Sequence, residues 1–328
     1  MFVFFTKFNN DHIAIFNRFF IHEYGHYYFA RKYGVGVTDF SIGFGQELFG
    51  WNDKNGTRWK VCWIQLGGYV KFFGDRNVYS QADHKEILEK YNKEEQDKLF
   101  ILKPLYQRVL IVFGGPLANF LLAIVIFFSI YTFIGKDFTP AVINEVQKNS
   151  PAMIGGLKNN DIILEIDNNK VESIMDVSKF ITTSTGDVIN FKVDRSNQEY
   201  LLKIKPNIVL SDDNLGNKIN KRMVGIKLGA YNNEINHVKL GPAQALIHSD
   251  KEVYFVSASS LKYIGTMLRG TGDSSQLGGP IRIAKITGQV AEIGILPFIS
   301  IMAYISISLG LINLFPIPIY LRDDALTK

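Results

Sequence analysis

Two long runs of apolar residues, 109–134 and 293–321, contain no charged residue. A helix over the first run would be about 39 Å long, which is enough to cross the hydrocarbon core of a bilayer. Both runs contain glycine, proline and asparagine, which in membrane helices usually mark a break or the wall of a polar cavity. We therefore expect two membrane spans; the alternative is a pair of buried helices in a large soluble core.

A third apolar stretch, residues 13–30, is interrupted by Asn17, Arg18, His22, Glu23 and His26. It is a poor span by hydropathy alone, so its polar residues are either functional or evidence against insertion. No cleavable signal peptide is evident, because charged residues interrupt the first apolar segment and no small-residue cleavage site follows.

The segment between this stretch and the first span, residues 33–107, mixes two patterns. Apolar and polar residues alternate at 38–45 and 59–64, which predicts short strands separated by glycine turns. Residues 82–100 are rich in charge and predict a helix that lies in water.

Residues 136–285 form a large polar insert whose first part, residues 141–206, has a compact αβ pattern. Strands are predicted at 141–146, 161–167, 188–195 and 199–206. A turn with a short helix is predicted at 151–157, and a longer helix at 171–183. One good helix among these strands favours a small, partly open barrel.

The composition narrows the class of protein. Apolar residues make up 47% and mean hydropathy is +0.05, which suits a mixture of membrane spans and a water-exposed domain. The 36 basic residues are scattered rather than clustered, so no nucleic-acid partner is expected. Cys62 is the single cysteine, which rules out an intramolecular disulfide, and its apolar neighbours predict a packing role.

The candidate chemistry lies in an HExxH pattern, which begins at His22 and ends at His26. On a helix these two imidazoles lie on one face, about 6 Å apart, and can share one Zn²⁺. Glu23 would act as the general base on a water activated by the metal. The alternative is a helix with two surface histidines, but the flanking residues, FFIHEYGHYYFA, are apolar, and buried ionisable groups are usually functional.

Seven blocks, in order, resemble the bacterial site-2 protease family of intramembrane zinc metalloproteases, most closely the regulator of sigma-E protease type. They are HEYGHYYFARKYGV at 22–35, FSIGFG at 40–45, LGGYVKFFGD at 66–75, GGPLANF at 114–120, SPAMIGGLKNNDIILEIDNNKV at 150–171, LGGPIRIAKI at 277–286 and GLINLFPIP at 310–318.

The resemblance implies roles for individual residues. His22 and His26 would ligate zinc, and Glu23 would activate water. Asn119 and Asn313 would lie near the active site and steady the substrate backbone or the oxyanion; the alternative is that each satisfies a helix break at a nearby proline.

The resemblance also implies a place and a substrate. The chain would be a multi-pass protein of the bacterial inner membrane, with a PDZ-like domain on the periplasmic side that binds a peptide or gates access. Its substrate would be a transmembrane protein such as an anti-sigma-factor-like protein.

The expected fold class is mixed: an α-helical membrane core, a short strand-rich membrane-associated segment and an inserted PDZ-like α+β domain. The expected divisions are an HExxH helix at 1–32, a strand-rich segment with the charged helix at 33–107, a transmembrane segment at 108–135, the PDZ-like domain at 136–210, a linker and membrane-proximal segment at 211–292, and a last transmembrane segment at 293–328.

The sequence departs from the family where the third zinc ligand is expected. The family pattern N-x-x-P-x-P-x-L-D-G predicts aspartate at 321, where Leu321 stands, and a further span beyond Lys328. Asp323 or Asp324 could serve as the third ligand only if the local backbone shifts. Charges also interrupt the apolar stretch before the HExxH. A second hypothesis is therefore a catalytically impaired membrane PDZ protein that binds peptides or partners without cleaving.

Overall fold

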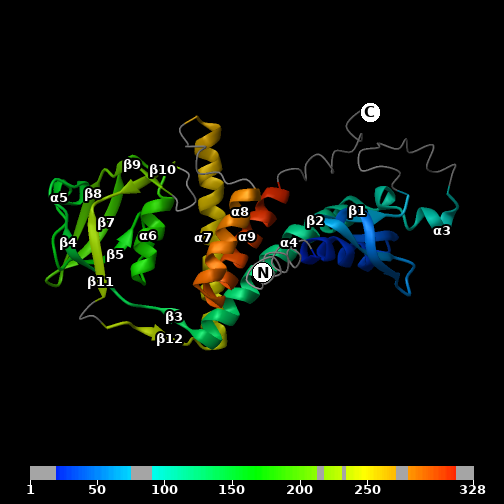
Figure 1. Cartoon of the computed structure of the whole chain (residues 1–328), viewed down its shortest axis with the longest axis horizontal. Helices are drawn as coiled ribbons and strands as arrows, with labels where there is room; N and C mark the ends of the chain where they lie inside the picture. Colours follow the sequence, from blue (N-terminus) through cyan, green and yellow to red (C-terminus); the bar gives the residue numbers. More distant parts are fainter. Residues whose placement is uncertain (1–19, 75–90, 213–217, 231–233, 271–279, 315–328) are drawn as a thin grey trace, which may run out of the picture. The chain divides into compact units, whose positions relative to one another are not determined.

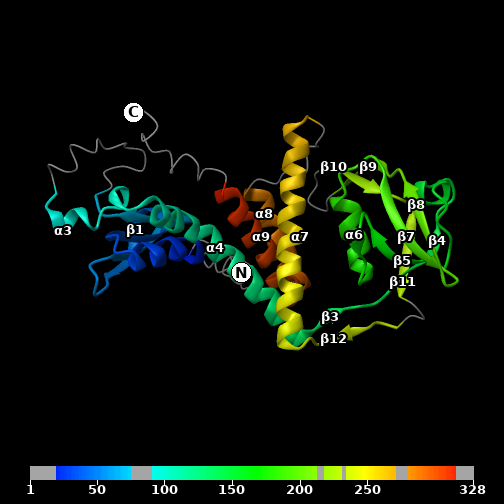
Figure 2. The same ribbon diagram turned by 180° about the vertical axis from the view of Figure 1, so that it is seen from behind.

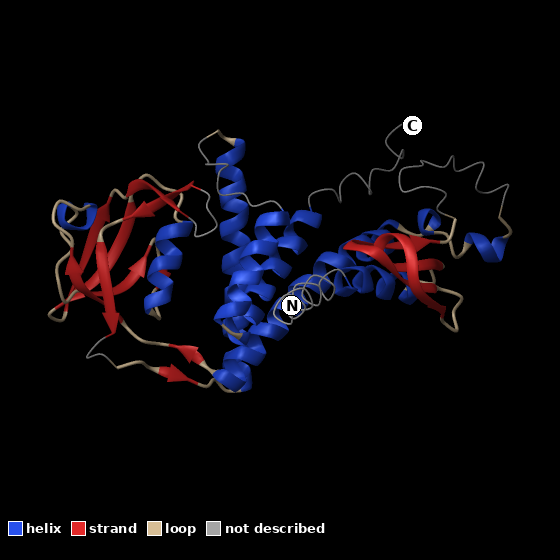
Figure 3. Cartoon of the chain, in the orientation of Figure 1, coloured by secondary structure: helices blue, strands red, loops and turns tan. Residues whose placement is uncertain are grey.

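The computed structural model describes residues 20–74, 91–212, 218–230, 234–270 and 280–314. The chain divides into two compact units, residues 1–126 with 287–328, and residues 127–286. Helices and strands occur in both units (Figure 3), which confirms the mixed helix and sheet composition.

The β-structure of the first unit is one long antiparallel hairpin of β1 (Val37–Asn52) and β2 (Arg58–Phe72). The Asp53 carboxylate accepts hydrogen bonds from two backbone amides of the turn between the strands. The prediction of short strands was wrong in length. Gly43 and Gly45, with φ of 89° and 85°, lie where the pairing register shifts, so they bend a continuous strand instead of ending it.

The charged segment at 82–100 is described only from residue 91. There it forms a single turn, α3 (Lys93–Gln96), which starts with a capping box made by Asn92 and Glu95. A short 3-10 helix, η1 (Phe100–Leu102), follows. Within residues 91–100 the prediction of one continuous helix is wrong, because the chain turns at Leu99 to bury that side chain, which is 3% exposed.

Three helices complete the first unit. The HExxH pattern lies on a helix over residues 20–32. α4 (Leu105–Ser129), whose last residues belong to the second unit, continues into a π-helical turn, η2 (Ile130–Ile134). α9 (Ile295–Leu314) is the third helix. The helical stretches 105–134 and 295–314 are long and apolar enough to cross a membrane, at the two places where the apolar runs predicted spans.

The HExxH helix is held against its neighbours by a small apolar core. Ala30 at its end, Val35 and Val37 at the start of the hairpin, and Ile111 on α4 are all buried and contact one another. Cys62 on β2 is also buried, as its apolar neighbours predicted. This packing places one face of the HExxH helix against α4.

The second unit contains an antiparallel sheet whose strands follow the spatial order β11-β4-β5-β7-β8. The strands and helices predicted between 141 and 206 are confirmed: β4 (Ala141–Val146), α5 (Pro151–Ile154), β5 (Ile162–Ile166), α6 (Ile174–Thr183), β7 (Ile189–Arg195) and β8 (Gln198–Ile204). β6 (Asn169–Lys170) is a short addition that pairs with β5. We call residues 141–230 the insert domain.

Segments outside 141–206 complete this unit, and the sequence did not indicate them. β11 (Ile226–Ala230) is an outer strand of the sheet, although it lies in the segment 211–292 that we expected to be a linker. The other additions are the hairpin of β9 (Asn207–Asp212) and β10 (Lys218–Met223), the ribbon of β3 (Lys136–Asp137) and β12 (His237–Val238), and the helices α7 (Pro242–Leu268) and α8 (Pro280–Ile293), the last of which ends in the first unit.

Helix α6 lies between the sheet and helix α7 in both views (Figures 1 and 2). The ring of Phe180 on α6 contacts that of Phe255 on α7, with centroids 5.1 Å apart. Phe255 also packs against the apolar core of the insert domain. Helix α7 therefore shares the hydrophobic core of the domain that precedes it.

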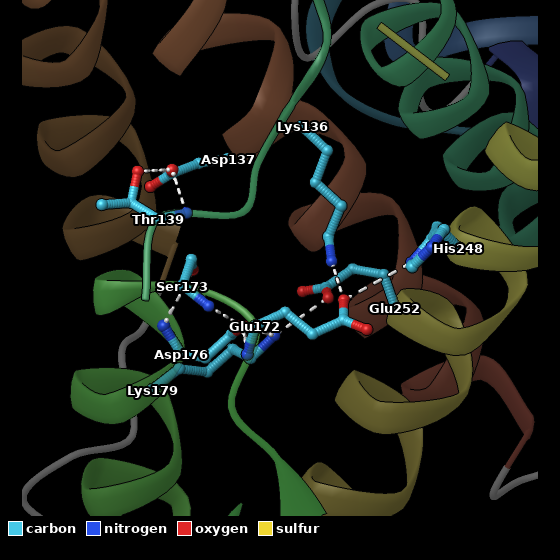
Figure 4. Close-up of polar contacts among 9 residues, drawn as sticks. All are labelled: Lys136, Asp137, Thr139, Glu172, Ser173, Asp176, Lys179, His248 and Glu252. Atoms are coloured by element: carbon cyan, nitrogen blue, oxygen red, sulfur yellow. Dashed lines mark hydrogen bonds and ion pairs between the residues drawn. The ribbon is translucent and has the colours of Figure 1, made fainter. Parts of the chain in front are cut away.

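Charged side chains join the insert domain to α7 in a cluster that we call the charged seam (Figure 4). The Lys179 ammonium on α6 lies 2.9 Å from the carboxylate of Glu252 on α7 and 3.3 Å from that of Asp176. Glu172 pairs with Lys136 and lies 3.7 Å from Nδ1 of His248 on α7. The charged groups that lie beside the apolar contact between α6 and α7 are therefore paired with one another, as partly buried polar groups require.

Candidate metal centre

The two histidines of the HExxH pattern face each other on the helix 20–32. The Nε2 atoms of His22 and His26 are 3.2 Å apart, and the rings are nearly perpendicular, at 82°. Two nitrogen ligands of one tetrahedral zinc ion lie about 3.3 Å apart, because each Zn–N bond is about 2.0 Å long. The paired imidazoles therefore already have the spacing that a shared zinc ion requires.

Helix α4 approaches the Nε2 atoms of the two rings closely, and three glycines on the two helices make this approach possible. A Cβ atom built on Gly115 would lie 2.3 Å from Nε2 of His26 and 2.7 Å from Cε1 of His22. On the HExxH helix, between the two histidines, a Cβ on Gly25 would lie 2.2 Å from the carbonyl oxygen of Gly114 on α4. Small residues let two helices approach at backbone distance, and here the approach brings the imidazoles onto the surface of α4.

Each imidazole is held through its Nδ1 atom by a group from α4. Nδ1 of His26 lies 2.8 Å from the carbonyl oxygen of Ile111, to which it donates. Nδ1 of His22 lies 3.0 Å from the carboxamide of Asn119. Partners of this kind orient histidines that bind metals, since they fix the ring and leave Nε2 for the ion. The donor set and its supports fit zinc.

Glu23 lies in the wall of the same site. Its side chain is 9% exposed, and a Cβ on Gly68 of β2 would lie 3.0 Å from its Cγ atom. The hairpin thus covers the Glu23 side chain at Gly68.

Two asparagines contact His22, but at opposite ends of its ring. Asn119 on α4 is fully buried beside Nδ1. The carboxamide nitrogen of Asn313 on α9 lies 3.3 Å from Nε2, at the edge that faces His26. α9 is held next to α4 here by Ser306, whose hydroxyl donates to the backbone carbonyl of Asn119 at 2.9 Å.

The structure thus brings together four of the residues that the sequence singled out: His22, His26, Asn119 and Asn313. Glu23 follows His22 on the same helix and is covered by β2 at Gly68. The remaining candidates for a third ligand, Asp323 and Asp324, lie outside the described residues. Among the residues that are described, no group of three His, Cys, Asp or Glu side chains gathers around one point.

Sequence reasoning gave no role to Gly115 or to the carbonyl of Ile111. Gly115 lies in the GGPLANF block, so its place in that block was the available signal. The Ile111 carbonyl has no signal in sequence, because any residue supplies the same backbone oxygen.

Comparisons with known proteins identify the family of this chain. The model of peptidase family M50 matches residues 12–320. A protein of Agrobacterium fabrum that carries a zinc metalloprotease name is 38% identical over 300 residues, which cover 92% of this chain and 79% of that protein. Metalloprotease MmpA of Caulobacter vibrioides is 32% identical over 320 residues, which cover 91% of this chain and 80% of that protein.

A comparison with solved structures finds a separate likeness. The PDZ domain of the SdrC-like protein from Listeria monocytogenes matches 28% of this chain and 88% of its own length, with 22% identity and a TM-score of 0.23. The match to the M50 model extends over nearly the whole chain, and the relatives that carry zinc metalloprotease names align over more than nine-tenths of it. The chain therefore belongs to peptidase family M50, whose members are zinc-dependent peptidases.

Proposed function

We propose that this chain is an intramembrane zinc endopeptidase that cleaves membrane-anchored regulatory proteins, with zinc held by His22 and His26. The observation that carries the proposal is the 3.2 Å separation of the two Nε2 atoms, against which the backbone of Gly115 packs. The two candidate spans, 105–134 and 295–314, carry Asn119 and Asn313 to the same histidine, which supports a site within the membrane.

Glu23 carries the proton in the proposed reaction. Zinc, when bound, polarises the scissile carbonyl and makes a water molecule more acidic. Glu23 removes a proton from the attacking water as the C–O bond forms, and delivers that proton to the amine nitrogen as the C–N bond breaks. Asn313, at the Nε2 edge of His22, is placed to donate a hydrogen bond to the carbonyl oxygen as negative charge develops on it.

The tail supplies the third protein ligand in this proposal only if Asp323 moves into reach. Catalytic zinc sites ordinarily have three protein ligands and one open position. Because Leu321 stands where the family pattern predicts aspartate, zinc affinity decides between the active protease and the catalytically impaired alternative.

We further propose that the insert domain is a PDZ-like domain that binds an extended peptide of the substrate. β11 pairs with β4 along one edge, and α6 packs beside it. A peptide strand added to the outer edge of β11 would gain main-chain hydrogen bonds and side-chain contacts with α6. The domain would lie on the periplasmic side of a bacterial inner membrane, and a transmembrane protein of the anti-sigma-factor type would be the substrate.

The experiment uses the full chain purified in detergent or nanodiscs. We expect about one zinc per chain and cleavage of a model transmembrane substrate, with both lost on chelation and in the variant His22→Ala with His26→Ala. His237→Ala, on the exposed strand β12, is the matched control and should change neither property. The impaired alternative would be established instead by a folded protein that binds a peptide of the substrate but does not bind zinc and does not cleave.

A further inference from the structure

Asn119 and Asn313 contact the same imidazole at different atoms, and this difference separates their roles. The Asn313 carboxamide lies at Nε2, the atom that faces His26. The Asn119 carboxamide lies at Nδ1, on the far side of the ring. A substrate at the proposed metal site approaches the Nε2 edge, so Asn119 is shielded from it by His22 itself.

We infer that Asn119 is a positioning residue for His22, and that it serves this histidine in both tautomers by turning over its carboxamide. The inference rests on the proposed zinc site of His22 and His26. Asn119 is 0% exposed, and α4 and the Ser306 contact hold its backbone. Its side chain therefore has one position, in which the carboxamide can take two orientations. Either its nitrogen or its oxygen faces His22.

One orientation suits the pair of histidines without a metal. The carboxamide nitrogen of Asn119 donates to Nδ1 of His22, and the proton of that ring then lies on Nε2, where the Asn313 carboxamide must present its oxygen rather than its nitrogen. His26 donates from Nδ1 to the Ile111 carbonyl, so its Nε2 is an acceptor 3.2 Å from the Nε2–H of His22. This arrangement leaves Oδ1 of Asn119 buried without a hydrogen-bond partner.

The other orientation suits a metal ligand. To bind an ion through Nε2, His22 must carry its proton on Nδ1 and needs an acceptor there. Rotating the carboxamide by 180° brings the otherwise unpartnered Oδ1 to Nδ1 at the same distance. Asparagine is suited to both states because its carboxamide offers a donor and an acceptor of nearly equal shape.

Two substitutions at this position separate positioning from packing. Asn119→Leu keeps the volume but offers no acceptor, so we expect zinc affinity to fall about 10–100-fold. Asn119→Asp keeps only acceptors, which favours the Nδ1–H tautomer, so zinc affinity should stay at or above that of the parent. Gly265→Ala, where a Cβ atom meets nothing within 4 Å, is the control and should bind zinc like the parent.

The measurements are zinc dissociation constants by chelator competition and the ¹⁵N NMR signals of labelled histidine in full-length protein. The parent should show His22 protonated at Nε2 without metal and at Nδ1 with zinc, whereas Asn119→Asp should show Nδ1–H in both states. Parent-like affinity in Asn119→Leu, or equal losses in the leucine and aspartate variants, would overturn the inference.

Failure of the proposed function has a different signature. A parent protein that binds no zinc contradicts the metal site, while the metal-free tautomer of His22 still reports on its hydrogen bond to Asn119. If the aspartate variant does not fold, Asn119→Ala replaces it, and an unchanged His22 signal in that variant contradicts the inference.

Discussion

The backbone of Gly115 lies directly against the ring of His26, and a Cβ atom at this glycine would stand 2.3 Å from Nε2. Nε2 of His22 would be 2.8 Å from the same atom. Both distances are far below ordinary van der Waals contact, so no side chain fits between α4 and the paired imidazoles. Gly115, which has no side chain, therefore determines whether the two imidazoles can occupy the metal site.

Gly115→Ala should therefore abolish zinc binding while the protein remains folded. The added methyl group must push one imidazole away, and a displacement of about 1 Å is large compared with the tolerance of a zinc bond. Metal content of the purified protein measures the effect. Gly265→Ala is the control, because a Cβ there meets nothing within 4 Å, and it should bind zinc normally.

Glu23→Gln should leave zinc binding intact and lower kcat/KM by about 10²–10⁴-fold, the usual contribution of a general base. The substitution keeps the shape of the side chain beside Gly68 but removes its ability to take a proton. The test measures zinc content and cleavage of a transmembrane substrate in parallel. Substantial turnover in the variant would show that another group acts as the base.

The tail variants test the third ligand. Leu321→Asp restores the family pattern and should raise zinc affinity and activity, because it adds a carboxylate at the expected register. Asp323→Ala combined with Asp324→Ala should change little, since these residues follow the expected position by two and three residues, up to about 7–10 Å along an extended chain. Loss of zinc from the double alanine variant would instead identify the tail as the natural third ligand.

The packing of α7 around His248 should become less stable as the pH falls. Burial, and after it the charge of Lys136, lowers the pKa of His248 below its ordinary value of 6.5, while Glu172 opposes the shift. Lys251 and Lys170 also face this group and lower its pKa. Because the unfolded chain takes up the proton at a higher pH than the folded one, the stability due to neutral His248 is present above about pH 6.5 and is lost below it.

Hydrogen exchange of the amides of α7 at pH 5.5 and pH 7.5 measures this dependence in the full chain. Exchange in the segment 242–257 should be faster at the lower pH, after correction for the intrinsic rates. His248→Gln should remove the difference, whereas His237→Gln on the exposed β12 strand should keep it. An unchanged difference in the His248 variant would assign the pH dependence to other groups.

The amino-acid sequence by itself determined the local parts of this protein. The strands and helices at 141–204 followed from alternation and helical periodicity, because each such element buries one face of its own residues. The two apolar runs indicated spans because they are long and uncharged, so a helix over either run is apolar on all sides. The HExxH spacing placed His22 and His26 on one side of a helix, because i and i+4 lie on one face whatever surrounds them.

Elements whose extent depends on partners could not be predicted. The long hairpin of β1 and β2 passes through Gly43 and Gly45, which look like turn residues until cross-strand pairing carries the strand past them. Helix α7 carries mixed polar and apolar residues, and it is stabilised by Phe180, Lys179 and Glu172 of the insert domain. A single-sequence pattern contains no information about such partners.

Only the tertiary structure decided how the site is completed. Gly115 and Asn119 lie about ninety residues from the HExxH motif, and α9 brings Asn313 from still further away. Sequence placed both asparagines near the active site without distinguishing them, whereas the fold sets one at Nδ1 and the other at Nε2 of His22. The physical reason is that a histidine ring has two chemically different edges, and the packing of the HExxH helix against α4 determines which residue meets each edge.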